Sequence, residues 1–183
     1  EVIVKLQEFE WRLGNFQNIR APTGTANYTQ SVNSRPANLR PGWLAQVYPT
    51  PRGEIQDLTG PDLGTFILDE TKFHLQIHDG HAIAQPNAAA YRLKAFYVAE
   101  KGGRHEFSFD LKYLCAGAMK SGSPANCKIR LYIDNRKVID QVSKLLPPNY
   151  SEVLLTGRIQ LEPGIYVVEA EIACNIGKSK GRD

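Results

Sequence analysis

The stretch from Lys128 to Asp140, KIRLYIDNRKVID, constrains the fold of this chain more than any other segment. Its first half alternates apolar and polar side chains, in the order Ile129, Arg130, Leu131, Tyr132, Ile133, Asp134. Alternation with a period of two is typical of a β-strand with one buried face, so we predict that the apolar members are buried and the polar members are exposed. Asp134, Asn135 and Arg136 then have the polarity of a tight turn, because asparagine tolerates a left-handed backbone. The stretch therefore predicts a β-hairpin, which needs a second packed layer to be stable.

Short apolar or alternating segments, separated by turns rich in glycine and proline, recur along the rest of the chain. They are Trp43–Tyr48, Phe66–Leu68, Phe73–Gln85, Tyr91–Ala99, His105–Cys115, Val153–Leu161 and Ile165–Cys174. No amphipathic helix pattern interrupts them, and many short strands with regularly spaced turns indicate a sandwich or a barrel. The sequence therefore predicts an all-β fold, an antiparallel two-sheet β-sandwich.

The length of 183 residues fits one domain with room for a terminal extension. We divide the chain into an N-terminal strand and connector (1–40), a main β-sandwich (41–177) and a tail (178–183). Within the first part, Glu8–Leu13 alternates like a strand, which either pairs with the main body or belongs to a preceding module. The start at Glu1 fits a mature form or an excised fragment.

Charge and composition exclude several classes of function. A net charge of +3 is too small to favour a nucleic-acid partner, and no apolar run is long enough to span a membrane. Sequence motifs for a nucleophile elbow, a zinc protease site and a phosphate-binding glycine loop are also absent. We therefore expect no nucleic acid, no membrane insertion and no catalytic residues, and we expect that the chain is not an enzyme.

Three cysteines allow one intramolecular bridge and leave one thiol over. Cys115 and Cys127 flank a loop of small residues, and closing it would stabilise the fold by about 3 kcal/mol. We expect a disulfide between these two residues and hence an oxidising compartment. The alternative is that Cys115, Cys127 and Cys174 are buried free thiols.

Four stretches resemble, in order, the domain first seen in the anthrax-toxin protective antigen. They are GWLAQVY at 42–48, YRLKAFYVAEKGGRHEFSFDL at 91–111, KIRLYIDNRKVID at 128–140 and LEPGIYVVEAEI at 161–172. That family is a β-sandwich of secreted toxins, glycosidases and microbial adhesins such as the yeast flocculins. The resemblance covers residues 41–177 and implies an extracellular or cell-surface location, reached by export, for example to the periplasm.

Several members of that family bind carbohydrate through a calcium ion, whose ligands include two consecutive aspartates just before the strand that reads Leu-Tyr-Ile-Asp. The matching positions here are Asn126 and Cys127. Asn126 still offers an amide oxygen, but the soft sulfur of Cys127 does not suit a hard cation. The resemblance implies calcium, whereas these two residues argue against it, and we expect no cofactor.

The polar face of the hairpin is the candidate ligand site. It comprises Arg130, Tyr132, Asp134, Asn135 and Arg136, with Asn126 at its start. An aromatic ring packs on the apolar face of a sugar while charged and amide groups bond its hydroxyls, so this face could contact a glycan. The alternative is an ordinary solvated strand face.

These observations lead to a functional hypothesis with two alternatives. We expect an extracellular recognition module, the part of an adhesin or surface appendage that binds a glycan or a cell-surface receptor. The first alternative is a structural or assembly domain of a larger surface protein, which binds another protein without sugar or calcium. The second alternative is an accessory domain of a glycosidase. The leading hypothesis rests on the family resemblance, whereas the departure from the family pattern at Asn126 and Cys127 favours the first alternative.

The remaining candidates have simpler explanations. His78 and His81 face each other across an Asp-Gly turn with Cβ atoms about 5 Å apart, so a third ligand would complete a transition-metal site. A polar face beside a turn is the favoured interpretation, and we expect no metal. His105 follows a turn and is expected on the surface. Trp11 and Trp43 lie in alternating segments and are expected in the core rather than as stacking platforms.

Overall fold

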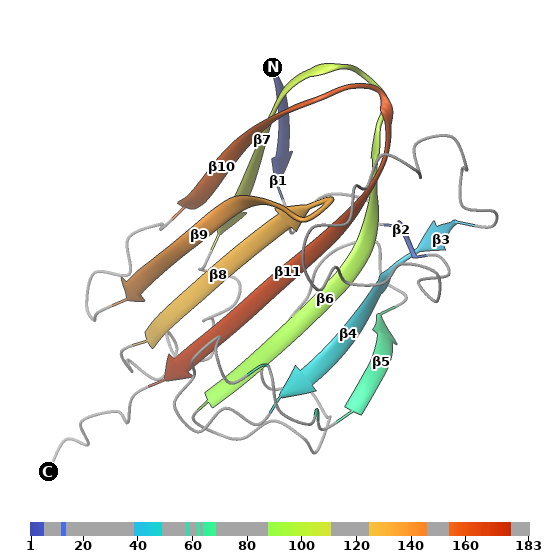
Figure 1. The fold of residues 1–183 in the computed structure, drawn as a ribbon. Helices are drawn as coiled ribbons and strands as arrows, with labels where there is room; N and C mark the ends of the chain where they lie inside the picture. The colour runs from blue at the N-terminus through green and yellow to red at the C-terminus, as the bar shows by residue number, and fades with distance from the viewer. Residues whose placement is uncertain are drawn as a thin grey trace, which may run out of the picture.

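The computed structural model describes residues 1–5, 12–13, 39–48, 58, 62, 64–68, 88–110, 125–145 and 154–176. The elements whose bounds lie within these residues are all strands, drawn in Figure 1. They are β1 (Val2–Lys5), β2 (Arg12–Leu13), β3 (Arg40–Pro41), β4 (Trp43–Tyr48), β5 (Gly64–Leu68), β6 (Ala88–Ala99), β7 (Gly103–Asp110), β8 (Ala125–Ile133), β9 (Arg136–Leu145), β10 (Leu154–Leu161) and β11 (Gly164–Ile176).

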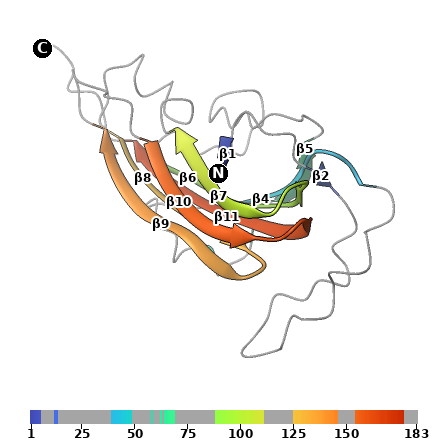
Figure 2. The same cartoon turned by 90° about the horizontal axis from the view of Figure 1, so that it is seen from above.

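The strands form two sheets that pack against each other (Figures 1 and 2). The larger sheet has eight strands, with β3-β2-β6-β11-β8-β9 in order and with β4 paired to both β5 and β6. The smaller sheet has the order β1-β7-β10. Neighbouring strands are antiparallel except for β1 and β7, which are parallel. The prediction of an all-β, two-sheet sandwich is therefore confirmed.

The described N-terminal residues pair with the main body of the chain. β1 lies beside β7 in the smaller sheet, and β2 pairs with β3 and β6 in the larger one. For Glu8–Leu13 the sequence leaves open whether the strand pairs with the main body or belongs to a preceding module. Its described part, Arg12–Leu13, pairs with the main body. The strand at Val2–Lys5 was missed, although its run of β-branched residues favours a strand. The hairpin predicted at Phe73–Gln85 lies outside the described residues.

Two corners carry the chain from one sheet to the other. β6 passes into β7 through residues 100–102, and β10 passes into β11 through residues 162–163. Since β6 pairs with β11 and β7 pairs with β10, the two corners lie side by side. These four strands therefore form one bent ribbon that joins the two sheets (Figure 1). The turns were predicted from glycine and proline, but the change of sheet was not.

Buried polar side chains hold both corners in place. The Tyr166 hydroxyl donates to the Glu162 carbonyl at 2.7 Å and accepts from the Glu162 N–H at 3.1 Å. At the other corner, His105 Nε2 lies 3.0 Å from the Lys101 carbonyl oxygen, and its Nδ1 lies 2.8 Å from the Tyr97 hydroxyl. A carbonyl only accepts, so Nε2 carries the proton and the Tyr97 hydroxyl donates to Nδ1. Burial raises the pKa of Tyr97 to about 12, which keeps this hydroxyl protonated as a donor.

The expectation that His105 lies on the surface is wrong, because this side chain is 1% exposed. His105 occupies the same face of β7 as Phe107 and Phe109, and that face points toward the larger sheet. The alternation along β7 indicated burial, whereas the adjacent turn suggested exposure. The alternation decides the position of the ring, and its two hydrogen bonds offset the loss of water.

The core lies between the sheets and follows the predicted alternation. Ile129, Leu131 and Ile133 of β8 are completely buried, whereas Arg130 and Tyr132 between them are half-buried. Trp43 of β4 is 1% exposed and belongs to the same core, as expected for a tryptophan on an alternating strand. The smaller sheet contributes Val4, Phe107, Phe109, Leu155 and Leu161.

The hairpin between β8 and β9 closes as predicted. Ile133 and Arg136 are register partners, so the loop contains only Asp134 and Asn135. Both have positive φ, at 44° and 62°, which is the backbone of a type I′ turn. Its twist matches that of the strands it connects, and the sequence marked it through the asparagine.

Candidate functional site

The polar face of the larger sheet, turned away from the core, is the candidate site, and we call it the outer face. On β8 it presents Asn126, Lys128, Arg130 and Tyr132, because the residues between them point inward and are buried. Three predicted site residues, Asn126, Arg130 and Tyr132, therefore share one face of one strand. Arg130 and Tyr132 are neighbours on it, whereas Asn126 lies about 20 Å along the strand from Tyr132.

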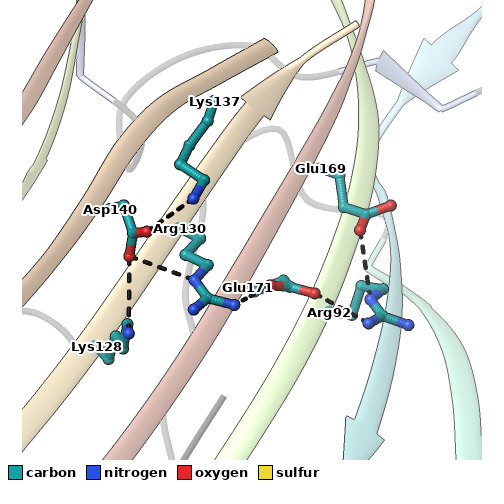
Figure 3. Close-up of polar contacts among 7 residues, drawn as sticks. All are labelled: Arg92, Lys128, Arg130, Lys137, Asp140, Glu169 and Glu171. Atoms are coloured by element: carbon teal, nitrogen blue, oxygen red, sulfur yellow. Dashed lines mark hydrogen bonds and ion pairs between the residues drawn. The ribbon is translucent and has the colours of Figure 1, made fainter. Parts of the chain in front are cut away.

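A row of charged side chains crosses the outer face from strand to strand (Figure 3). Its members are register partners on four adjacent strands, namely Asp140 on β9, Arg130 on β8, Glu171 on β11 and Arg92 on β6. We call these four residues the charged row. Opposite charges that face each other across strands stabilise the pairing, so the row fixes its own side chains.

Glu171 is the centre of the charged row, and only 10% of its side chain is exposed. Its Oε1 accepts a hydrogen bond from Arg92 Nη2 at 2.9 Å, and its Oε2 lies 3.8 Å from Arg130 Nη1. Arg92 also meets Glu169 at 3.4 Å between Nε and Oε1, and Lys94 Nζ lies 3.3 Å from the other oxygen of Glu169. Charge-assisted contacts of this kind hold the long side chains in one arrangement.

Asp140, at the end of the charged row, forms ion pairs with three cationic side chains. Its carboxylate lies 3.0 Å from Lys137 Nζ, 3.3 Å from Arg130 Nε and 3.8 Å from Lys128 Nζ. The hydrogen bond from Lys137 is the largest of the influences that hold the pKa of Asp140 below its ordinary value. The carboxylate is therefore ionised at neutral pH.

Two tyrosines flank the charged row. Tyr132 is half-buried beside Arg130 on β8, and burial raises its pKa. At the other end, the Arg92 guanidinium lies 5.6 Å from the ring centroid of Tyr48 and donates from Nη1 to the Tyr48 hydroxyl at 3.2 Å. Tyr48 packs with Leu58, Ala90 and Ala173 in a small apolar cluster on the outer face. Leu58 thus covers that end, and the half with Tyr132 and Asp140 stays open to solvent.

The turn residues have different positions from the strand residues. Asn135 is exposed in the turn, and Arg136 is exposed at the first position of β9. Asp134 Oδ1 accepts a hydrogen bond from the Val167 N–H at 2.8 Å, and the Asp134 N–H donates to the Val167 carbonyl at 2.8 Å. The side chain of Asp134 therefore fastens the turn to β11, which leaves it a structural role besides the ligand contact predicted for it.

Burial raises the pKa of Asp134, against the smaller opposing influence of the Val167 hydrogen bond. A carboxyl whose pKa is raised by folding stabilises the native state most below its unfolded pKa, and that stabilisation is lost as the pH rises through the folded pKa. We expect the stability of Asp134→Asn relative to wild type to increase from pH 3 to pH 7, because the variant has no buried carboxyl to ionise. Asparagine keeps the acceptor oxygen and tolerates the positive φ, so the turn itself should be unchanged. Urea unfolding at the two pH values measures this.

Asp134→Ala is the control for that prediction. It removes the acceptor and places an alanine at φ 44°, so we expect a loss of about 1–2 kcal/mol at pH 7. If the difference between Asp134→Asn and wild type does not change with pH, burial does not perturb this carboxyl.

The sequence analysis did not identify the other three members of the charged row, namely the two acidic partners of Arg130 and the Arg92 that meets one of them. Glu171, Arg92 and Asp140 all occupy outward positions of alternating strands, and that signal was present in the sequence. Their meeting in one row depends on which strands are neighbours and in which register. Neither the strand order nor the register can be read from the local sequence, so the charged row could not be predicted.

The residues that would replace the calcium ligands of the resembled family do not fit this ion. Asn126 is exposed on the outer face, whereas Cys127 is completely buried on the opposite face of β8 and forms a disulfide. Adjacent strand residues point to opposite faces, so these two side chains cannot hold one ion. Within the described ranges, no group of three histidine, cysteine or acidic residues could hold a metal.

Other predicted residues fall on parts of the chain that are not described. Cys115, His78, His81 and Trp11 are among them, so the Cys115–Cys127 pairing and the histidine pair remain predictions. No helix in the described parts of the chain is long and apolar enough to cross a membrane.

Comparison with known proteins shows a limited structural similarity and no sequence match. No family model matches the chain, and no curated protein matches it in sequence. Two solved structures of a β-glucosidase from Kluyveromyces marxianus resemble it, one in complex with glucose and one labelled with selenomethionine. The first has a TM-score of 0.44 and 17% identity, covering 78% of this chain and 16% of that chain. The second has a TM-score of 0.40 and 14% identity, covering 78% and 15%.

The expectation that this chain is not an enzyme is corrected by that comparison, since both similar structures are of an enzyme. The chain spans only 16% and 15% of their lengths, and the TM-scores lie below 0.5. A likeness of this size does not identify an activity, and we assign no reaction to the chain.

Proposed function

We propose that the chain is a recognition module, secreted or displayed at a cell surface as part of an adhesin or surface appendage. It binds glycans through the outer face of the larger sheet. The single observation that carries the proposal is the charged row beside Tyr132, an ordered polar surface that stays open to solvent at the end with Asp140. The resemblance of residues 41–177 to a family with carbohydrate-binding members supports the same function.

The chemistry of this surface suits a sugar. Guanidinium and ammonium groups donate hydrogen bonds to hydroxyls, carboxylates accept them, and a tyrosine ring packs on the C–H face of a sugar ring. Arg130 and Glu171 are already held by their partners, so binding would not have to order them. Such preorganisation lowers the entropic cost of association.

Replacing Tyr132 tests the proposal directly. A glycan array on the wild-type chain identifies the best oligosaccharide, and calorimetry then compares the variants with it. We expect Tyr132→Ala to bind about 10-fold more weakly, because an aromatic anchor at a contact contributes more than most of its neighbours. We expect Tyr132→Phe, which keeps the ring, to stay within about 3-fold of wild type.

A response to no sugar on the array, with and without calcium, would rule out the proposal. It would leave the second candidate, a structural or assembly module that binds another protein. In that candidate, Val142, which is 60% exposed on β9 next to Lys128, would be an apolar contact with polar groups around it, the arrangement that protein interfaces have. Val142→Ser would then reduce capture of the partner.

A further inference from the structure

We propose that the glycan bound on the outer face is acidic, and that Lys128, Arg130 and Lys137 bind its carboxylate or sulfate group beside Asp140. This inference rests on the proposed function and names the class of ligand for that site. The three cations and Asp140 are called the cation cluster below, and Figure 3 shows them around the carboxylate.

The charged side chains of the outer face form two groups that differ in net charge. On β6 and β11, Arg92 and Lys94 meet Glu169 and Glu171, so two cations face two carboxylates. On β8 and β9, the cation cluster has three cations and one carboxylate, with Glu171 already shared with Arg92. Counted over the residues that the structure describes, the second group therefore carries a net charge of about +2, which an anionic ligand would compensate.

The smaller sheet provides a contrast on the same molecule. Arg104 meets Glu1 at 3.0 Å, and Arg158 meets both Glu1 and Glu106. Among the side chains, two cations and two carboxylates balance there, although the arginine side chains are 58% and 59% exposed. Exposed arginine alone is thus no mark of an anion site in this chain, and the cation cluster differs from this patch by its uncompensated charge.

The cluster is accessible and partly preorganised. The exposed fractions of the side chains are 30% for Lys128, 28% for Arg130 and 51% for Lys137. A guanidinium offers paired N–H donors to a planar carboxylate or a sulfate, and each ammonium adds a compact charge. Asp140 keeps the three head groups together, so an anion would meet them in place.

The neighbours of the cluster favour a sugar as the carrier of the negative group. Tyr132 and Lys137 are register partners, so an aromatic ring lies directly beside one cation of the cluster. A ligand that places an acidic group on the cluster and a sugar ring on Tyr132 uses both features. A free inorganic anion would leave the ring unused.

The test is calorimetry on the full chain with three oligosaccharides of similar length, namely oligogalacturonate, a chondroitin sulfate oligomer and neutral maltohexaose. We expect one or both acidic probes to bind at least about 10-fold more tightly than the neutral one at low salt. This preference should shrink as the salt is raised from 0.05 M to 0.5 M, because salt screens exposed charges. The two acidic probes distinguish a carboxylate from a sulfate as the bound group.

The variant Lys128→Gln/Lys137→Gln should bind the preferred acidic probe about 10-fold more weakly, since each exposed charge contact contributes about 3-fold. Its binding to the neutral probe should be unchanged. Arg158→Gln is the matched control, because it removes one exposed cation from the balanced patch of the other sheet. It should bind every probe like wild type.

Each other outcome decides against part of the inference. Equal affinity for the acidic and neutral probes overturns the acidic ligand while the proposed glycan binding stands. If no glycan binds, on the array or in calorimetry, both fail together. If polyglutamate binds as tightly as the acidic oligosaccharides and with the same loss in the double variant, the cluster serves an acidic peptide, and the assignment to a glycan is wrong.

Discussion

Gly157→Ala is expected to destabilise this protein by about 3 kcal/mol, because the new methyl group has no space. A Cβ at this position would lie 2.0 Å from the carbonyl oxygen of Val138 and 2.8 Å from Ile139 Cγ1. Gly157 belongs to β10 in the smaller sheet, and the other two residues belong to β9 at the edge of the larger one. The obstacle is backbone, so the two strands would have to move apart, and the core between the sheets would open.

Thermal unfolding measures this effect, with an expected fall in Tm of about 6–12 °C for a chain of this size. Gly164→Ala is the matched control, since the atoms nearest to a Cβ there belong to the Tyr166 side chain, at 3.6–3.8 Å, which is ordinary van der Waals contact. Its stability should stay within about 1 kcal/mol of wild type. If Gly157→Ala is as stable as Gly164→Ala, then β9 and β10 do not approach each other this closely in solution.

The close approach at Gly157 also shows what could not be predicted from the sequence. The glycine sits inside the predicted strand Val153–Leu161, and a glycine within a strand indicates a bulge or a nearby backbone. Nothing in the local sequence identifies Val138 as that backbone, because β9 and β10 belong to different sheets. The alternation predicted the strands and their buried faces, but the contacts between sheets required the three-dimensional arrangement.

The strands and hairpins whose own sequence shows alternation or a turn signal were the easiest to predict. The β8–β9 hairpin was found because the buried and exposed faces alternate and because asparagine marks the turn. β11 was found in the same way, with Val168, Ala170 and Ile172 inward. β6 and β8 were also predicted as strands, but their pairing with β11 was not, since antiparallel strands distant in the sequence give no local sign of their register.

The candidate site divides in the same way. Arg130 and Tyr132 could be assigned to an exposed face from their own strand. The fixed arrangement of that face depends on Glu171. The whole residue is only 7% exposed, although a glutamate at an outward strand position is expected to be exposed. Glu171 is buried because Arg92 and Arg130 flank it from both neighbouring strands and cover it with their side chains.

Glu171→Ala is accordingly expected to destabilise the fold by about 2 kcal/mol at neutral pH and to weaken ligand binding. The carboxylate separates two guanidinium groups, and without it Arg92 and Arg130 would face each other across β11 with one negative charge fewer between them. Removing one member of a fully buried ion pair costs about 3–5 kcal/mol, and the arginine side chains here are 24% and 28% exposed, so solvent screening reduces the loss. Chemical denaturation of the variant measures it.

Glu169→Ala provides the comparison, since it lies on the same strand and the same face, with 27% of its side chain exposed and with Arg92 and Lys94 as partners. We expect a loss of about 0.5–1 kcal/mol, because its partners are near solvent and Arg92 keeps Glu171. The ratio between the two variants is the decisive quantity. Equal losses would mean that the charged row is an ordinary set of surface ion pairs, and Glu171 would then give the outer face no fixed arrangement for a ligand to recognise.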